Sequence, residues 1–98
     1  MTISVERNNT TVILKVEGRL DTTTAPALEH TVNEESKTIT ELVLDFEKLT
    51  YISSAGLRVL LGAQKKMNTQ GSMKLIHVCS EVMEVLEMTG FADILVIE

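Results

Sequence analysis

The chain has 98 residues, a formal net charge of −5 and an apolar fraction of 44%. This length and apolar content predict one domain with its own core, spanning residues 1–98, and exclude an intrinsically disordered chain. The negative charge argues against a nucleic-acid partner, because binding to phosphates requires clustered Lys and Arg side chains.

The residues also indicate the compartment in which the protein works. Cys79 is the only cysteine, which excludes an intramolecular disulfide and is typical of a reducing compartment. The first residues lack the basic and then apolar layout of a secretory signal, and no apolar stretch approaches the roughly 18 residues of a membrane span. We therefore expect a cytoplasmic protein with no membrane contact, and a monomer by default.

Two segments near the start of the chain alternate between polar and apolar residues, which is the pattern of half-buried strands. They cover residues 2–6 and 11–17, and the turn signal Asn8-Asn9 lies between them. We predict that the two segments form a hairpin that ends at Gly18.

Three helices are predicted from apolar residues at helical spacing and from capping residues at the helix ends. The first follows a run of threonines and carries Pro26 in its first turn, where proline is tolerated. The predicted helices run from residue 25 to near Ser36, from Ser54 to a cap at Gly71, and from a cap at Ser80 to a stop at Gly90.

Short apolar runs predict three further strands, at residues 42–44, 73–78 and 94–97. The predicted order of elements is ββαβαβαβ. Helices that alternate with strands imply right-handed crossovers and a largely parallel or mixed sheet. We therefore predict an α/β fold with one central sheet and about three helices.

The side chains give little support for enzyme chemistry. A serine hydrolase needs a base within reach of its serine, and the only histidines, His30 and His77, form no recognisable motif with Ser53 or Ser54. A single cysteine and two distant histidines give no metal-ligand spacing, and no Gly-rich loop matches a phosphate-binding pattern. We expect no metal, no cofactor and no catalysis. A hydrolase that uses Ser54 stays as an alternative, which hydrolysis of simple activated esters would support.

The sulfur-containing side chains have ordinary explanations. No basic cluster near Cys79 would activate its thiol, so a quiet, partly buried thiol is favoured over a redox sensor. Four methionines lie in apolar segments and are predicted to fill the core. They are Met67, Met73, Met83 and Met88.

The serine pair before the second helix has two interpretations. Serine is a preferred N-cap that stabilises a helix by about 0.5–2 kcal/mol relative to alanine, and one serine satisfies this role. If Ser53 is the cap, Ser54 is the first helical residue and its hydroxyl projects outward. Gly56 follows, although glycine costs about 1 kcal/mol relative to alanine inside a helix. A missing side chain there would let a partner's backbone approach, so the second interpretation is a site of modification.

A phosphate on Ser54 would act on binding more than on folding. It adds a charge of about −1.5 to −2, and a helix N-terminus stabilises an anion by about 0.3–1 kcal/mol. At an acidic or tightly packed interface, the same charge meets a repulsion of several kcal/mol. Phosphorylation at this position is therefore expected to release a partner without unfolding the domain.

Two motifs resemble the bacterial anti-sigma factor antagonists of the STAS domain family. They are Gly18-Arg19-Leu20-Asp21 and the run from Leu44 to Leu57, which reads Leu-Asp-Phe-Glu-Lys-Leu-Thr-Tyr-Ile-Ser-Ser-Ala-Gly-Leu. The later segment Met88-Thr89-Gly90-Phe91 resembles the closing helix and turn of the family. The resemblance covers essentially the whole chain, and it implies a STAS-like fold and a binding function without catalysis.

The resemblance also implies a partner switch. In this family the unmodified antagonist binds an anti-sigma factor that is a serine kinase with a histidine-kinase-like ATPase fold, and this binding frees the sigma factor. The kinase phosphorylates the serine that opens the second helix, which separates the pair, and a PP2C-type phosphatase reverses the modification. By motif alignment the acceptor is Ser54. Ser53 is a minor alternative, at a position where many members have Asp.

A docking surface around the acceptor is implied in the same way. Asp21 matches an acidic family position that is important for kinase recognition, and Asp45 is a weaker candidate near the same edge of the sheet. Arg58 lies in the first turn of the second helix, where it either pairs with an acidic partner residue or is merely solvated. The expected partner-binding residues are Asp21, Thr22, Asp45, Ser53, Gly56, Leu57 and Arg58.

One other function is open within the family. A STAS domain that never switches can act as a fixed subunit of a transporter, a secretion-control system or a sensory complex. Stable partner binding by a Ser54→Asp variant would favour this alternative.

Overall fold

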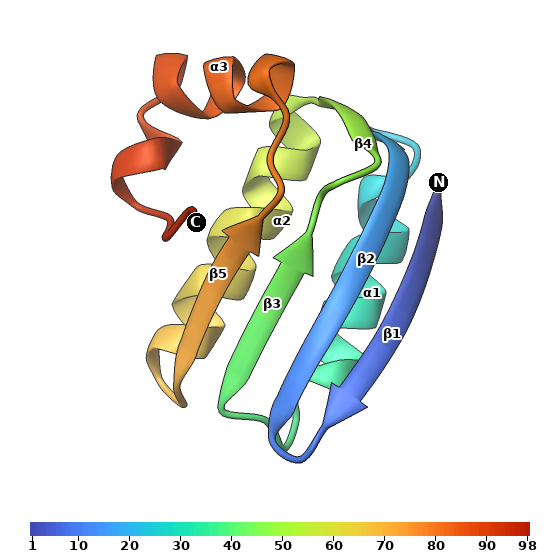
Figure 1. Ribbon diagram of the computed structural model, residues 1–98, viewed down its shortest axis with the longest axis vertical. Coiled ribbons are helices and arrows are strands. Elements are labelled where there is room, and N and C mark those ends of the chain that lie inside the picture. Colours follow the sequence, from blue (N-terminus) through green and yellow to red (C-terminus); the bar gives the residue numbers. More distant parts are fainter.

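A five-stranded sheet forms one layer of the molecule, and two helices cover one of its faces as a second layer (Figure 1). The computed structural model describes residues 1–98. The third helix lies across one end of the sheet (Figure 1). The elements are β1 (Thr2–Asn8), β2 (Thr11–Leu20), α1 (Ala25–Glu35), β3 (Glu41–Asp45), β4 (Leu49–Ile52), α2 (Ser54–Asn68), β5 (Ser72–Ile76), α3 (Ser80–Met88) and the 3₁₀ turn η1 (Phe91–Asp93).

The long strand β2 organises the sheet, whose order is β1-β2-β3-β5 with β4 also paired to β2. β1 and β2 form the predicted antiparallel hairpin, and Asn9 supplies the positive φ that its two-residue turn requires. The first half of β2 pairs in parallel with β3, and its last residues pair in parallel with β4. Gly18, at φ +105°, marks the change of partner, and the register of β2 with β4 shifts just after it. This fork carries β4, and the helix after it, to the end of β2.

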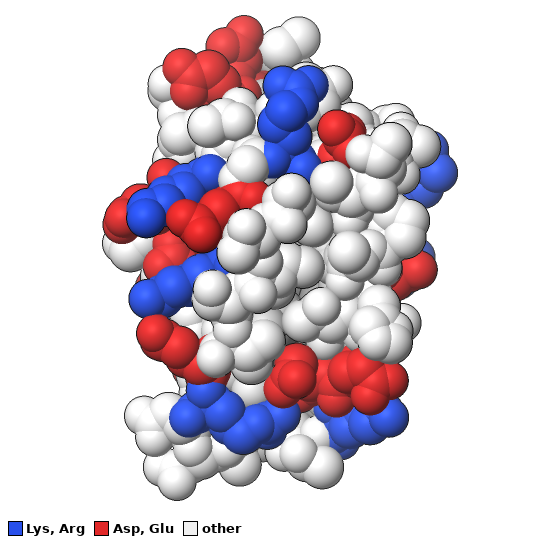
Figure 2. All heavy atoms as spheres, turned by 90° about the vertical axis from the view of Figure 1, so that its right-hand side faces the viewer, with Lys and Arg blue, Asp and Glu red and all other residues white.

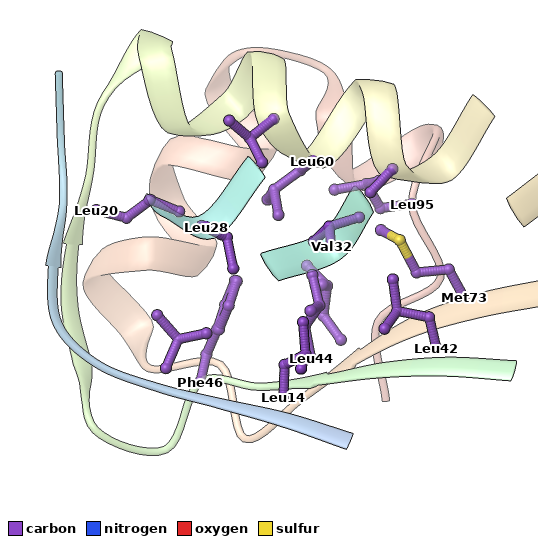
Figure 3. Close-up of a cluster of buried hydrophobic side chains, with 14 of the residues drawn as sticks. Leu14, Leu20, Leu28, Val32, Leu42, Leu44, Phe46, Leu60, Met73 and Leu95 are labelled. Atoms are coloured by element: carbon purple, nitrogen blue, oxygen red, sulfur yellow. The ribbon is translucent and has the colours of Figure 1, made fainter. Parts of the chain in front are cut away.

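The core lies between the sheet and the helices α1 and α2 (Figure 3). Alternation along the strands points one row of side chains at the helices, including Leu14 of β2 and Leu44 of β3. Leu28 of α1 and Leu60 of α2 meet this row from the other side, and all four leucines are fully buried. Burial of one such side chain contributes about 1.5–3 kcal/mol. With only three aromatic residues in the chain, aliphatic side chains supply most of this core.

The predicted fold class is confirmed, but the predicted order of elements is wrong in two places. The structure contains β4, which the sequence analysis missed because its two buried residues, Leu49 and Ile52, are not alternate residues of the strand. The predicted strand at residues 94–97 is absent. A 3₁₀ turn precedes this segment, and only a single parallel bridge joins Ile97 to Leu75 of β5.

Two smaller expectations also need correction. Met67 and Met73 are buried as predicted and Met83 is half-buried, but Met88 is 79% exposed at the end of α3. The N-cap of α3 is Cys79, one residue before the predicted Ser80. None of the helices combines the length and the apolar character that crossing a membrane would require.

Candidate functional site

The predicted acceptor Ser54 is the first residue of α2, at the end of the sheet where β2 and β4 terminate (Figure 1). The backbone N–H of Ser53 donates a hydrogen bond of 2.9 Å to the carbonyl oxygen of Leu20, which ties the helix start to the last residue of β2. The N–H of Leu57 donates to the carbonyl oxygen of Ser53 at 3.0 Å and begins the helical pattern. Ser54 is exposed, so its side chain is accessible to another protein.

Ser53 occupies the predicted N-cap position, but its side chain does not cap. Its backbone is extended (φ −106°, ψ 177°), as an N-cap residue requires. The hydroxyl oxygen makes no capping hydrogen bond and is buried without any partner. A hydroxyl in this position is not accessible to a kinase, which favours Ser54 over Ser53 as the acceptor.

The loop before α1 lies beside this helix start, because Asp21 directly follows Leu20. Oδ1 of Asp21 accepts hydrogen bonds from the hydroxyl of Thr23 at 2.7 Å, from the N–H of Thr23 at 3.0 Å and from the N–H of Thr24 at 3.2 Å. The hydroxyl hydrogen bond from Thr23, aided by the two N–H groups, holds the pKa of Asp21 below its ordinary value. The carboxylate therefore organises this turn, and Thr22 is left exposed on it.

Gly56 and Leu57 are buried, which corrects the expected reason for the glycine. A Cβ at Gly56 would lie 2.6 Å from Cγ of Leu20 and 2.9 Å from Cγ1 of Ile52. The missing side chain lets α2 pack against β2 and β4, rather than letting a partner approach. Leu57 is 6% exposed and belongs to the core. These two residues position the predicted acceptor Ser54 from the protein interior, whereas Arg58, the next residue along the helix, is exposed.

Two exposed residues beside the site were not among the sequence candidates. The guanidinium carbon of Arg19 lies 4.1 Å from the centre of the Tyr51 ring, a cation–π arrangement between paired residues of β2 and β4. Nε of Arg19 lies 3.9 Å from Oδ2 of Asp21, so the same side chain reaches the loop. Both residues occur in the two motifs that carry the family resemblance. The sequence analysis missed these two residues because it did not predict β4, and only the pairing of β4 with β2 places Tyr51 opposite Arg19.

Asp45 is not brought together with the other candidates. It pairs with Lys15 on β2, five residues before Leu20, so about 16 Å of strand separates it from the start of α2. Its Oδ1 lies 3.0 Å from Nδ1 of His77 and accepts a 3.0 Å hydrogen bond from the N–H of Glu47. Asp45 also borders a polar cavity of about 310 Å³ at the fork of β2, which Ser4, Lys15, Val16, Glu17, Glu47 and Lys48 complete.

The remaining reactive side chains form no catalytic arrangement with the serines. His77 is engaged with Asp45, and His30 is exposed on α1. The thiol of Cys79 is half-buried and donates to the carbonyl oxygen of Leu49 at 3.4 Å. No group of three His, Cys, Asp or Glu side chains is arranged to hold a metal ion.

Comparison with known proteins finds one family model that matches the chain, together with similar sequences and solved structures. The family model described as the STAS domain matches residues 2–98. BtrV of Bordetella bronchiseptica is 33% identical over 96 residues, which cover 96% of this chain and 83% of BtrV. The anti-sigma-B factor antagonist of Bacillus subtilis is 26% identical over 94 residues, which cover 95% of this chain and 86% of that protein. The solved structure of the Bacillus cell fate determinant SpoIIAA in its phosphorylated form superimposes with a TM-score of 0.77 at 18% identity. The match covers 99% of this chain and 91% of that structure.

Proposed function

Because the chain belongs to the STAS domain family, we propose that it is an anti-sigma factor antagonist that phosphorylation of Ser54 switches off. The observation that carries the proposal is the exposed Ser54 at the first position of α2, beside the loop that Asp21 organises. The related protein of Bacillus subtilis is named an anti-sigma-B factor antagonist, and the structurally similar SpoIIAA has been solved in a phosphorylated form. In this proposal the chain is a regulatory binding protein rather than an enzyme.

The proposed partner is an anti-sigma factor that is also a serine kinase with a histidine-kinase-like ATPase fold. The unmodified chain binds this kinase and thereby frees the sigma factor. The ATP belongs to the partner, so this chain needs no cofactor. The docking surface consists of the residues around the acceptor that another protein can reach. Thr22, Ser54 and Arg58 are exposed, Asp21 is partly exposed, and Arg19 and Tyr51 lie at the margin.

The buried neighbours of Ser54 have a different role in this proposal. Ser53, Gly56 and Leu57 fix the start of α2 against Leu20, so the backbone that carries the acceptor is held in place. Asp45 lies outside the docking surface, because it is bound to His77 on another part of the sheet. The proposal therefore narrows the expected contact residues to those that another protein can reach.

A phosphate on Ser54 releases the partner by electrostatics. The N-terminus of α2 stabilises the added anion by about 0.3–1 kcal/mol, so the domain stays folded. In the interface, the same charge of about −1.5 to −2 must lose its water and meet the partner's surface, which costs several kcal/mol. The interface cost is the larger of the two. A PP2C-type phosphatase then restores the binding form.

The test is an intact mass measurement with site mapping after incubation with ATP and candidate kinases from the source organism. The proposal predicts one added phosphate on Ser54, which a PP2C-type phosphatase removes. Ser54→Ala should take up none, and Ser53→Ala should still be phosphorylated. Binding of a candidate kinase without any phosphate transfer would instead favour a STAS domain that acts as a fixed subunit. Phosphate on Ser53 in the unaltered chain would contradict the assignment of the acceptor.

A further inference from the structure

The strand β1 forms one edge of the sheet and leaves its outer side unpaired. All seven of its residues pair with β2 in an unbroken register, from Thr2 opposite Glu17 to Asn8 opposite Thr11. Proteins usually protect such an edge with a bulge, a proline or charged side chains, or by keeping the edge strand very short. β1 is seven residues long and has no bulge, proline or lysine. Its charged side chains are Glu6 and Arg7, and each is already paired within the chain, with Lys15 and Glu35. β1 is therefore a regular strand edge that is open to pairing with another strand.

The outward backbone groups of β1 can be assigned from its hairpin. In an antiparallel pair, residues that exchange hydrogen bonds with the partner strand alternate with residues that do not. The residues that flank a two-residue turn, here Asn8 and Thr11, form a bonded pair. The N–H and C=O groups of Ile3, Val5 and Arg7 consequently point away from β2. These three residues can form hydrogen bonds with a new strand without losing any that hold β1 to β2.

Two apolar side chains of β1 extend the core to this edge, where it is only partly covered. Ile3 and Val5 lie opposite Val16 and Leu14, both buried, so they point at the helix-covered face of the sheet. Val5 is nevertheless 44% exposed, because no strand lies beyond it. A strand added at this edge would cover Val5 and extend the apolar layer by one row.

Part of this edge borders an uncharged area of the surface. Figure 2 views the molecule from this side and shows white atoms over its centre, with charged side chains on the left, at the bottom, near the top and at the right margin. The ion pair of Arg7 with Glu35, at 2.8 Å, shows which side of α1 faces β1. One and two helical turns before Glu35, the same side of α1 carries Thr31 and Ala27. This area therefore combines part of the edge of β1 with an uncharged side of α1.

We infer that β1 is the dimerisation interface of this protein, where it pairs antiparallel with β1 of a second copy about a two-fold axis at Val5. In this register Ile3 of each copy lies opposite Arg7 of the other, and Ser4 lies opposite Glu6. About six backbone hydrogen bonds form, and no like charges are opposed. A register shifted to place the axis at Glu6 would oppose two carboxylates, which is destabilising.

A second copy is the occupant favoured by this self-complementarity. The sequence analysis predicted a monomer. In the proposed dimer, the two sheets form one continuous sheet, with both α1 helices on the same side. The acceptor Ser54 belongs to α2, so the interface does not depend on the proposed switch. An edge strand of a different protein is the competing occupant.

The first experiment is sedimentation equilibrium on the full chain over a concentration series up to about 1 mM, the concentration range of weak association. The expected result is a reversible monomer–dimer equilibrium. Val5→Lys places two ammonium groups at the two-fold axis and should raise the dissociation constant at least tenfold. The matched control is Val96→Lys, because Val96 is 51% exposed and lies in the C-terminal segment, beside the opposite edge strand. A monomer throughout would overturn the inference and leave the edge to another protein, and so would equal effects of the two lysines.

Hydrogen exchange tests the register without any variant. The amides of Ser4 and Glu6 bond to β2 and should be protected at every concentration. The amide of Val5 points outward and should gain protection only as the dimer forms. A dimer in which protection of the Val5 amide does not depend on concentration would overturn the inference, since a different surface would then join the copies.

Discussion

Gly56 lies directly against Leu20, so close that a methyl group on Gly56 would lie 2.6 Å from Cγ of the leucine. This contact joins the first turn of α2 to the last residue of β2. It explains why the chain accepts a glycine in a helix, which costs about 1 kcal/mol relative to alanine. The position of Ser54 depends on this close packing.

Gly56→Ala should destabilise the domain by about 1–2 kcal/mol, because overpacking costs about 1–3 kcal/mol and the gain in helix propensity is at most about 1 kcal/mol. Gly62→Ala is the matched control on the same helix, since a Cβ there would have no neighbour within 4 Å. The control should be stabilised by about 0.5–1 kcal/mol. Urea unfolding of both variants measures the difference. Equal stability changes would mean that the contact with Leu20 is not restrictive.

Asp21→Asn should weaken the dependence of folding stability on pH in the acid range. Hydrogen bonds from Thr23 and Thr24 lower the pKa of Asp21 in the folded state. Its contribution is therefore fully present above its unfolded pKa, about 3.9, and is lost as the pH falls through the lower folded pKa. Thermal unfolding between about pH 2 and pH 6 should show a weaker pH dependence for Asp21→Asn. The matched control is Asp93→Asn, which removes an exposed carboxyl group in η1. This variant should keep the pH dependence of thermal unfolding seen in the unaltered chain.

The sequence predicted the fold class because the apolar periodicity of its long elements is strong. The helices α1 and α2 start within one residue of the predicted positions, since threonines, a proline and serines mark these starts. β4 could not be recognised in the same way. Only four residues long, it owes its strand conformation to pairing with β2 beyond Gly18. The segment 94–97 has a strand-like composition, but a single bridge to Leu75 holds it.

The location of the candidate acceptor in the fold was predictable from the sequence, and the arrangement of its neighbours was less so. The position of Ser54 at the start of α2 follows from the sequence spacing, whereas its role as the acceptor is implied by the family resemblance. The burial of Gly56 and the separation of Asp45 from the site are tertiary effects. They depend on where β2 changes partner, and no local pattern in the sequence marks that point beyond the single residue Gly18.

Ser54→Asp should weaken binding to the proposed kinase at least tenfold, which corresponds to about 1.4 kcal/mol. Its melting temperature should stay close to that of the unaltered chain, because a carboxylate at the N-terminus of α2 is favourable. Ser72→Asp places the same charge at an exposed position at the start of β5, at the other end of the sheet, and should bind normally. Binding titration and thermal unfolding of the same samples provide the comparison. Loss of fold in step with loss of binding would reduce Ser54 to a structural residue.

His77→Gly should raise the pKa of Asp45. Burial by itself raises this pKa, but the hydrogen bond from His77, the N–H of Glu47 and the charges of His77 and Lys15 outweigh it, so the pKa lies below its ordinary value. Glycine suits the backbone of His77, whose φ is +57°, so this change removes the ring without adding strain.

An NMR titration of the Asp45 carboxyl carbon measures this change directly. With the imidazole gone, the effect of burial remains and the midpoint should move to higher pH. Because a lowered carboxyl pKa gives stability that is lost as the pH falls through the folded value, this loss should also begin at higher pH in His77→Gly. His30→Ala removes the other imidazole, on α1, and should leave the midpoint in place. An unchanged midpoint in His77→Gly would show that the 3.0 Å contact between Nδ1 and Oδ1 does not control the ionisation of Asp45.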